Sequence, residues 1–376
     1  MRSRRRSDSR VVILGAGILG VSSAVHAARR GLRVTIVTEG QVGSGASGRS
    51  LSWLNAAAVR APEYHRLRVA GLDRYRTLAT DERTRSWLRF DGGVMWGTPD
   101  ETPRYEELLA FESEHGYDAI WASPAELSEL APGIHPGAVP PDGVLVNPGD
   151  GWVDLPSLLR HLLAELLRHG GTVVENAGAA RPVVEDGRVT GVRTSRGEVL
   201  DADRVLLATG AVTPAVLAQL GVAVPDRTTV GLLVRTAPLR HPLRAVLNTP
   251  RVAVRPAPGG RFVLDAGWSE QEVGRRDDGT FDVRESTVAG LLREAAAVLE
   301  GRPELTVESC GVGPKPIPGD GDPVLGAVPG VEGLFVAFTH SGATLGLIAG
   351  ELLADEIVDG EEHPMLGPFR LTRFAH

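Results

Sequence analysis

The chain has 376 residues, a formal net charge of −7, and 42% hydrophobic and 23% charged residues. This length predicts two domains or one large domain, and the composition excludes collagen and disfavours intrinsic disorder. The negative charge disfavours binding to nucleic acid, which requires a basic surface. The single cysteine, Cys310, excludes an intrachain disulfide and a cysteine-rich zinc site, and we expect no metal.

The N-terminal segment has two interpretations. Residues 1–10 are basic and polar, and residues 11–25 carry no charge. They could form a twin-arginine signal, or a disordered tail over 1–9 followed by a strand, a glycine turn and a helix. The glycine spacing favours the second. No other stretch approaches the roughly 20 apolar residues of a membrane span, so we expect a cytoplasmic protein without a membrane partner.

A nucleotide-binding unit is predicted next. The apolar run 11–14 indicates a buried strand, and a helix over 21–30 and a second strand over 34–37 follow. Residues 15–20 read G-A-G-I-L-G, a turn that lets backbone approach a pyrophosphate at a helix N-terminus. Glu39 can bind ribose hydroxyls and would repel a 2′-phosphate. Together these features favour a dinucleotide site over a glycine-rich turn without a ligand.

Further segments decide between NAD and FAD. In order along the chain, they resemble the D-amino-acid oxidase family of flavoenzymes, which implies FAD. The segments are GSGASGRS at 43–50, DGWVD at 150–154, DGRVTGV at 186–192, ATG at 208–210, GPKP at 313–316 with DGDPVLG at 320–326, and HSGATLG at 340–346.

The resemblance implies an α/β fold with two interleaved domains. One is an FAD-binding Rossmann-like domain of the glutathione-reductase type, and the other is an α+β substrate domain with an antiparallel sheet. Alternating runs at 229–234 and 261–264 predict strands of that sheet, and an Ala/Leu helix is predicted over 286–300. The expected boundaries are 10–85, 146–215 and 310–372 for the FAD domain, and 86–145 and 216–309 for the substrate domain.

The resemblance also implies a set of cofactor-binding residues. A final helix is predicted from about Gly342 to Asp359, with its positive N-terminal end towards the flavin. The residues expected at FAD are Gly15, Ala16, Gly17, Ile18, Leu19, Gly20, Thr38, Glu39, Gly45, Ala46, Ser47, Arg49, Ser50, Leu51, Ala180, Arg181, Ala208, Thr209, Gly210, Gly313, Lys315, Gly342, Ala343, Thr344 and Leu345.

Two residues are candidates for catalysis. Lys315, the only lysine of the chain, stands where many relatives carry an arginine that binds the substrate carboxylate. It could bind that carboxylate as a point charge, lie beside the flavin, or be a surface lysine. His340 could touch the flavin edge or the substrate, or be a packed structural histidine. The candidates for substrate binding are Trp53, Asn55, Arg255 and Lys315.

Three positions argue against a true sarcosine oxidase. Relatives of that type carry lysines where this chain has Asp265 and Gly346. They also hold FAD covalently through a cysteine where this chain has Gly313, three residues after Cys310. We therefore expect non-covalent FAD, with Cys310 as a small buried hydrophobe.

The leading functional prediction is an FAD-dependent oxidase of an amino acid or related amine. Such an enzyme oxidises a C–N bond to an imine by hydride transfer to flavin N5, and O2 is then reduced to H2O2. One alternative is a dehydrogenase on the same fold that passes electrons to a quinone or carrier, and either could be a biosynthetic tailoring enzyme. Another is a flavin-binding protein without turnover. The sequence identifies neither the substrate nor the oligomeric state.

Overall fold

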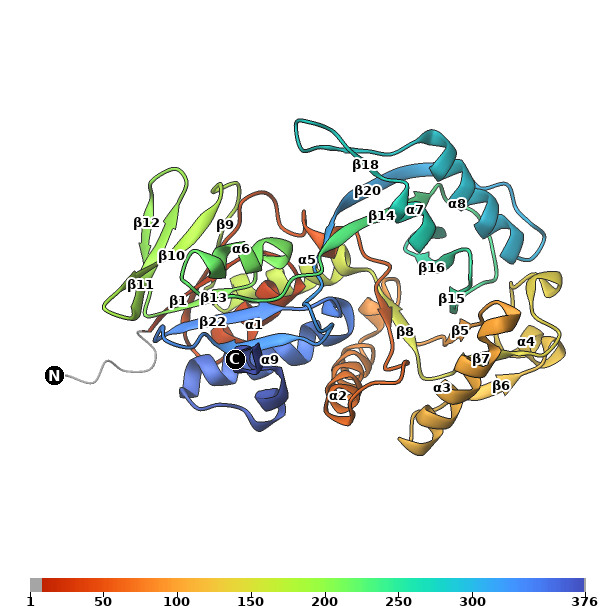
Figure 1. Ribbon diagram of the computed structural model, residues 1–376, viewed down its shortest axis with the longest axis horizontal. Coiled ribbons are helices and arrows are strands. Elements are labelled where there is room, and N and C mark those ends of the chain that lie inside the picture. The colour runs from red at the N-terminus through yellow and green to blue at the C-terminus, as the bar shows by residue number, and fades with distance from the viewer. Residues whose placement is uncertain (1–8, 375–376) are drawn as a thin grey trace. The chain divides into compact units, whose positions relative to one another are not determined.

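The structure is a computed structural model that describes residues 9–374 (Figure 1). The predicted tail therefore lies outside the described residues, except for Ser9, whose carbonyl accepts a hydrogen bond from Arg33 N. The chain forms two compact units. The first comprises Leu155–Thr229 with the described parts of Met1–Gly48 and Pro314–His376, and the second comprises Arg49–Asp154 and Val230–Gly313.

The first unit is built on a six-stranded sheet. Its strand order is β21-β22-β13-β1-β2-β9, and all neighbours are parallel except β21, which is antiparallel to β22. Short apolar strands buried on both faces are typical of parallel sheets. The strands are β1 (Arg10–Leu14), β2 (Arg33–Val37), β9 (Thr172–Val174), β13 (Arg204–Leu207), β21 (Val324–Ala327) and β22 (Leu334–Phe338).

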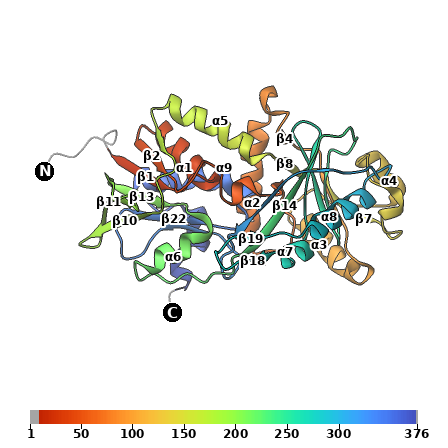
Figure 2. The same cartoon turned by 90° about the horizontal axis from the view of Figure 1, so that it is seen from above.

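Helices cover one face of this sheet and a smaller layer covers the other (Figure 2). On the helical side, Gly350 of α9 lies so close to Ser22 of α1 that a Cβ would overlap it. On the other side, Val189 and Leu217 pack against Val205 in one core cluster. The helical side contains α1 (Ile18–Arg29), α5 (Leu155–Arg168) and α9 (Gly342–Asp359); the other contains β10 (Ala180–Glu185), β11 (Arg188–Thr194), β12 (Val199–Asp201) and α6 (Thr213–Ala218).

The second unit contains an eight-stranded sheet of order β20-β14-β17-β16-β15-β5-β7-β6. β15 and β5 are parallel, while the pairs β14–β17, β15–β16, β16–β17, β5–β7 and β6–β7 are antiparallel. The strands are β5 (Gly93–Met95), β6 (Ile120–Ala122), β7 (Val144–Asn147), β14 (Thr229–Thr236), β15 (Val246–Asn248), β16 (Ala253–Ala257), β17 (Arg261–Asp265) and β20 (Val307–Lys315).

The two faces of this sheet differ in chemistry. Val254 and Leu264 point to one face and join a large apolar core with Leu291 of α8. Strand alternation turns Arg255 and its pair partner Val263 to the other face.

Other elements of this unit are α2 (Pro62–Leu78), α3 (Thr102–Glu114), α4 (Pro124–Leu130), α7 (Gly267–Gln271), α8 (Glu285–Val298), β3 (Trp53–Leu54), β4 (Leu88–Arg89), β8 (Gly151–Val153), β18 (Gly274–Arg275) and β19 (Phe281–Asp282).

The predicted fold class is confirmed, since a parallel Rossmann-like sheet and a mostly antiparallel sheet are both present. The predicted last helix is observed as α9. The two compact units differ from the expected division at four segments: residues 49–85, 146–154 and 310–313 fall in the second unit, and residues 216–229 fall in the first. Strand pairing accounts for the first two of these segments, since β8 lies between β3 and β4 in a small sheet. No helix within residues 9–374 has the length and apolar character needed to cross a membrane.

Candidate functional site

Four segments predicted to bind the cofactor reach one edge of the parallel sheet. Gly15 follows β1, Glu39 lies two residues after β2, Ala208 follows β13, and His340 lies two residues after β22. The carboxyl ends of parallel strands meet at one edge, which is where ligands bind in open α/β sheets. The fold therefore brings together residues that are more than 300 positions apart in the sequence.

The glycine turn of residues 15–20 is shaped by close backbone contacts. Gly15 has φ +105°, and a Cβ there would overlap the carbonyl oxygen of Ala208. A Cβ at Gly20 would overlap the carbonyl oxygen of Gly15. At Gly17, by contrast, the nearest neighbour of an added Cβ is the Ser47 hydroxyl at 3.2 Å. Gly15 and Gly20 are thus required by backbone packing, whereas a side chain at Gly17 would be limited by the Ser47 hydroxyl alone.

The N-terminus of α1 is suited to bind an anion. Its N-cap is Gly17, which offers no capping side chain, and the first turn holds no acidic residue. Ser47 Oγ, from the second glycine-rich segment, accepts a hydrogen bond from Ile18 N at 3.0 Å. The turn, the helix end and the serine together fit a pyrophosphate, which the helix dipole would stabilise. These residues therefore fit FAD.

Other residues predicted to bind FAD lie in the first unit at the same sheet edge or beside it. The carbonyls of Thr38 and Glu39 accept backbone hydrogen bonds that fix the chain after β2. A Cβ at Gly342 would lie 3.5 Å from the Ile18 side chain, so α9 begins beside the start of α1. The remaining members of this group are Ala16, Leu19, Gly45, Ala46, Ala180 and Arg181 on β10, Thr209, Gly210, Ala343, Thr344 and Leu345.

The two candidates for catalysis belong to the first unit. Lys315 is half-buried at the end of β20, and His340 is exposed between β22 and α9. The remaining residues predicted to bind FAD or the substrate belong to the second unit. They are Arg49, Ser50, Leu51, Trp53, Asn55, Arg255 and Gly313.

Arg49 lies along a glycine-lined part of β20. A Cβ at Gly313 would lie 2.5–2.9 Å from the Arg49 guanidinium, and a Cβ at Gly311 would lie 2.8 Å from its Cγ. Partial burial lowers the pKa of Arg49. A cysteine at 313 could not be accommodated without displacing Arg49. The expectation that Cys310 is buried is wrong: it is exposed, because β20 turns residues 307–310 to solvent.

Arg255 is the largest fully buried side chain of the described residues, at 1% exposure. Its guanidinium donates a hydrogen bond to the Pro256 carbonyl at 2.8 Å and lies over the Trp152 ring at 5.4 Å. No ion pair joins it to another described residue, and its Nε has no hydrogen-bond partner among them. Burial lowers the pKa of Arg255 to about 10, so it stays charged at neutral pH.

A buried polar network holds the segment that follows Arg49. Asp150 is fully buried and accepts hydrogen bonds from Trp53 Nε1 at 2.8 Å and from the Tyr117 hydroxyl. Burial raises the pKa of Asp150 to about 8. The backbone and side-chain oxygens of Asn55 accept from Arg68 at 2.7 and 2.8 Å. Trp53 and Asn55 are therefore held by buried partners.

Sequence reasoning missed most of this network. Asp150 was visible as the start of the DGWVD segment, but nothing marked its role. Tyr117 and Arg68 stand in no motif, because they meet Asp150 and Asn55 only through the tertiary fold.

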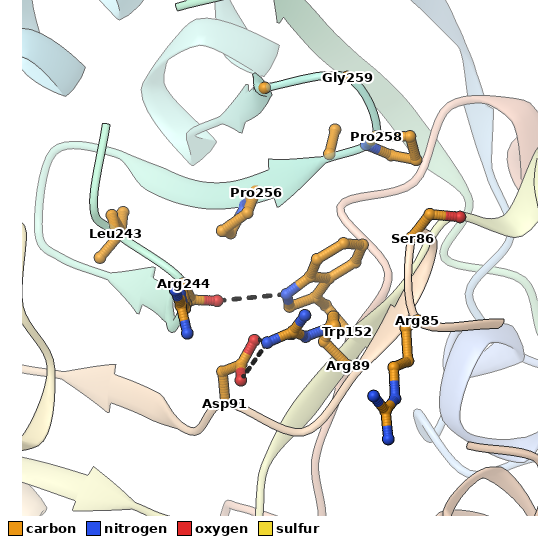
Figure 3. Close-up of a pocket in the computed structure, with 12 residues that line it drawn as sticks. Arg85, Ser86, Arg89, Asp91, Trp152, Leu243, Arg244, Pro256, Pro258 and Gly259 are labelled. Carbon is orange, nitrogen blue, oxygen red and sulfur yellow. Dashed lines mark hydrogen bonds and ion pairs between the residues drawn. The ribbon is translucent and has the colours of Figure 1, made fainter. Parts of the chain in front are cut away.

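The second unit also contains a cavity of about 360 Å³, shown in Figure 3. The Trp152 indole stands in its wall and donates a hydrogen bond to the Arg244 carbonyl at 3.2 Å. The lining residues are Arg85, Ser86, Arg89, Asp91, Trp152, Leu243, Arg244, Pro256, Ala257, Pro258, Gly259 and Gly260.

Comparison with known proteins assigns the class. Residues 10–356 match the family model described as DAO, FAD dependent oxidoreductase. The chain belongs to this family of FAD-dependent oxidoreductases, and the resemblance drawn from the sequence segments is confirmed.

Particular relatives span nearly the whole chain. A glycine oxidase from Pseudomonas aeruginosa is 30% identical over 96% of this chain and 97% of its own. A D-amino acid dehydrogenase from Cereibacter sphaeroides is 28% identical over 93% and 92%. The crystal structure of glycine oxidase from Geobacillus kaustophilus matches with a TM-score of 0.83 at 25% identity, over 98% of this chain and 100% of that chain.

Proposed function

We propose that the protein is an FAD-dependent oxidase of an amino acid or a related amine that carries a carboxylate. In this proposal the first unit binds FAD non-covalently and the second binds the substrate. The glycine oxidases among its relatives support the choice of substrate class and of oxygen as the electron acceptor.

The substrate-binding part of this proposal rests on Arg255. A buried cation without an anionic partner is costly, since burial removes the water that would otherwise stabilise it. Folded proteins keep such a group where a ligand supplies the missing charge. A carboxylate can occupy two guanidinium donors at once, which a lysine cannot offer. We therefore place Arg255 before Lys315 as the residue that binds the substrate carboxylate.

The other candidate residues receive roles consistent with their positions. When bound, FAD would accept the hydride from the carbon that carries the substrate nitrogen. Lys315 and His340 are proposed to contact the substrate or the flavin. Trp53 and Asn55 are proposed to orient the substrate, because their buried hydrogen bonds fix them beforehand. No side chain need act as acid or base in the hydride step.

A dehydrogenase is the second candidate. Asp265 stands where the oxygen-activating lysine of sarcosine-oxidase-like enzymes is expected, and a D-amino acid dehydrogenase is among the relatives. Electrons would then pass to a quinone or a carrier protein. Peroxide formed in a one-to-one ratio with oxidised substrate would exclude this candidate, while dye reduction without peroxide would establish it.

The first experiment is the visible spectrum of the purified protein, before and after acid precipitation. Two oxidised-flavin bands that move to the supernatant are expected for non-covalent FAD. A screen of amino acids and amines, each followed by peroxide detection, then tests the substrate class. Flavin that stays in the pellet would contradict the non-covalent proposal, and flavin that no amine reduces would contradict the proposed reaction.

A further inference from the structure

The cavity of the second unit is built like a ligand site (Figure 3). Its volume of about 360 Å³ falls in the range of about 300–1,000 Å³ that small-molecule sites occupy. All of its lining residues belong to the second unit. The roles proposed above for FAD and substrate use none of them.

The Trp152 wall of the cavity is held from several sides. Its strand, β8, pairs with Trp53 of β3 and with Arg89 of β4. Its indole N–H is bound to the Arg244 carbonyl, and the Arg255 guanidinium lies over its ring. A wall fixed in this way loses little freedom when a ligand binds. Leu243, Pro256 and Pro258 extend the apolar lining.

The charged lining residues are mostly basic. Arg85, Arg89 and Arg244 line the cavity, and Asp91 is the one acidic residue among the lining side chains. Arg89 already pairs with Asp91 through two hydrogen bonds of 2.9 Å. Arg85 pairs with Glu82 at 3.3 Å. The Arg244 side chain forms no ion pair with any residue from 9 to 374, so it is the lining cation whose charge is left uncompensated.

We propose that this cavity binds a small organic carboxylate with an apolar body. Arg244 would bind the carboxylate, and Trp152 with Leu243 and Pro256 would contact the apolar part. Charge-assisted hydrogen bonds supply the recognition of the anion, and the fixed indole supplies the apolar contact. The carboxylate could belong to the far end of a large substrate or to a separate ligand.

Calorimetric titration of the FAD-loaded protein with 2-naphthoate tests this site. Arg244→Ala removes the unpaired cation but keeps the carbonyl that holds Trp152. Arg251→Ala is the matched control, since the Arg251 carbonyl also accepts a hydrogen bond from a tryptophan, Trp268, but Arg251 lines no part of the cavity. Ser86→Trp is a second variant, because Ser86 is an exposed lining residue where a large side chain changes the lining.

The expected result is saturable binding that Arg244→Ala weakens by at least about tenfold, as for a lost hydrogen bond to a charged group. Ser86→Trp should weaken it as well, Arg251→Ala should not, and uncharged 2-naphthamide should bind more weakly than the carboxylate. No binding, or binding that neither cavity variant changes, would overturn the proposal.

Kinetics then separate the two sources of the carboxylate. Competitive inhibition of amine oxidation by 2-naphthoate would identify the far end of the substrate. A change in kcat without competition would identify a separate ligand. The titration itself does not depend on turnover, so failure of the proposed oxidation would leave this test intact.

Discussion

A buried arginine in each unit has a different kind of partner. In the first unit, Arg370 forms a bidentate pair with the buried carboxylate of Glu356. In the second unit, Arg255 has a backbone carbonyl and an aromatic ring as its contacts, and no carboxylate. A paired buried charge contributes to the structure of its own unit, whereas an unpaired one indicates a ligand.

The two units would also bind their ligands through different chemical groups. The first unit offers backbone groups at the α1 N-terminus, so side-chain atoms added in the glycine turn should weaken cofactor binding. The second unit offers a side-chain charge on Arg255, so removing that charge should weaken substrate binding.

The largest expected effect on stability is at Arg370. Arg370→Met leaves Glu356 buried without its partner and should lower the free energy of unfolding by about 3–5 kcal/mol. Chemical denaturation measures this change. Arg188→Met is the control, because the Arg188–Glu332 pair is exposed and should cost no more than about 1 kcal/mol. Equal effects of the two variants would contradict the structural role of the Arg370 pair.

Gly15→Ala should abolish most FAD binding. The new Cβ would overlap the Ala208 carbonyl and force a residue with φ +105° into a strained conformation. Gly31→Ala is the matched control, since Gly31 also has positive φ but nothing within 4 Å of an added Cβ. The flavin-to-protein absorbance ratio measures the outcome. A Gly15→Ala protein that retains full flavin would show that the turn does not shape the cofactor site.

Arg255→Met should behave unlike Arg370→Met. Because Arg255 forms no ion pair, and the buried Asp154 that attracts it keeps its own pair with Arg235, the free energy of unfolding should stay the same or rise by about 1–2 kcal/mol. FAD content should not change, since Arg255 lies outside the glycine turn. A loss of stability comparable to that of Arg370→Met would mean that Arg255 is a structural residue.

A further prediction is a pH dependence of stability at Asp150. Burial raises its pKa from 3.8 to about 8, so between these values the folded state keeps a proton that the unfolded state releases. Its contribution to stability is therefore lost as pH rises, by at most about 1.4 kcal/mol per pH unit. Asp150→Asn should remove this slope from denaturation curves taken at pH 5–8, and Asp277→Asn, at an exposed site, should not. An unchanged slope in Asp150→Asn would contradict the raised pKa.

The sequence predicted the backbone site much better than the side-chain site. The turn after β1 and the start of α9 were predictable because short-range spacing sets backbone geometry. Arg255 was named in the sequence, but nothing there showed that it is buried and unpaired. That property depends on Trp152 and Pro256, which meet it through strand pairing and tertiary packing.

The boundaries of the units were missed for a similar reason. Residues 49–85 follow the nucleotide-binding strands in sequence, but β3 pairs with β8 and Trp53 binds Asp150, nearly 100 residues away. Hydrogen bonds between distant segments leave no periodic signal in the sequence. For the same reason, the sequence did not indicate the roles of Tyr117 and Arg68 or the cavity beside Trp152.

The most direct test of the unpaired Arg255 is a comparison of two substrates in two proteins. The best amino acid from the amine screen and its counterpart lacking the carboxylate are assayed with wild type and Arg255→Met. The wild type should prefer the carboxylate-bearing substrate in kcat/KM by about 10–100-fold, the value of a charged hydrogen bond. Arg255→Met should erase that preference while keeping its flavin. A preference that survives in Arg255→Met would contradict the account.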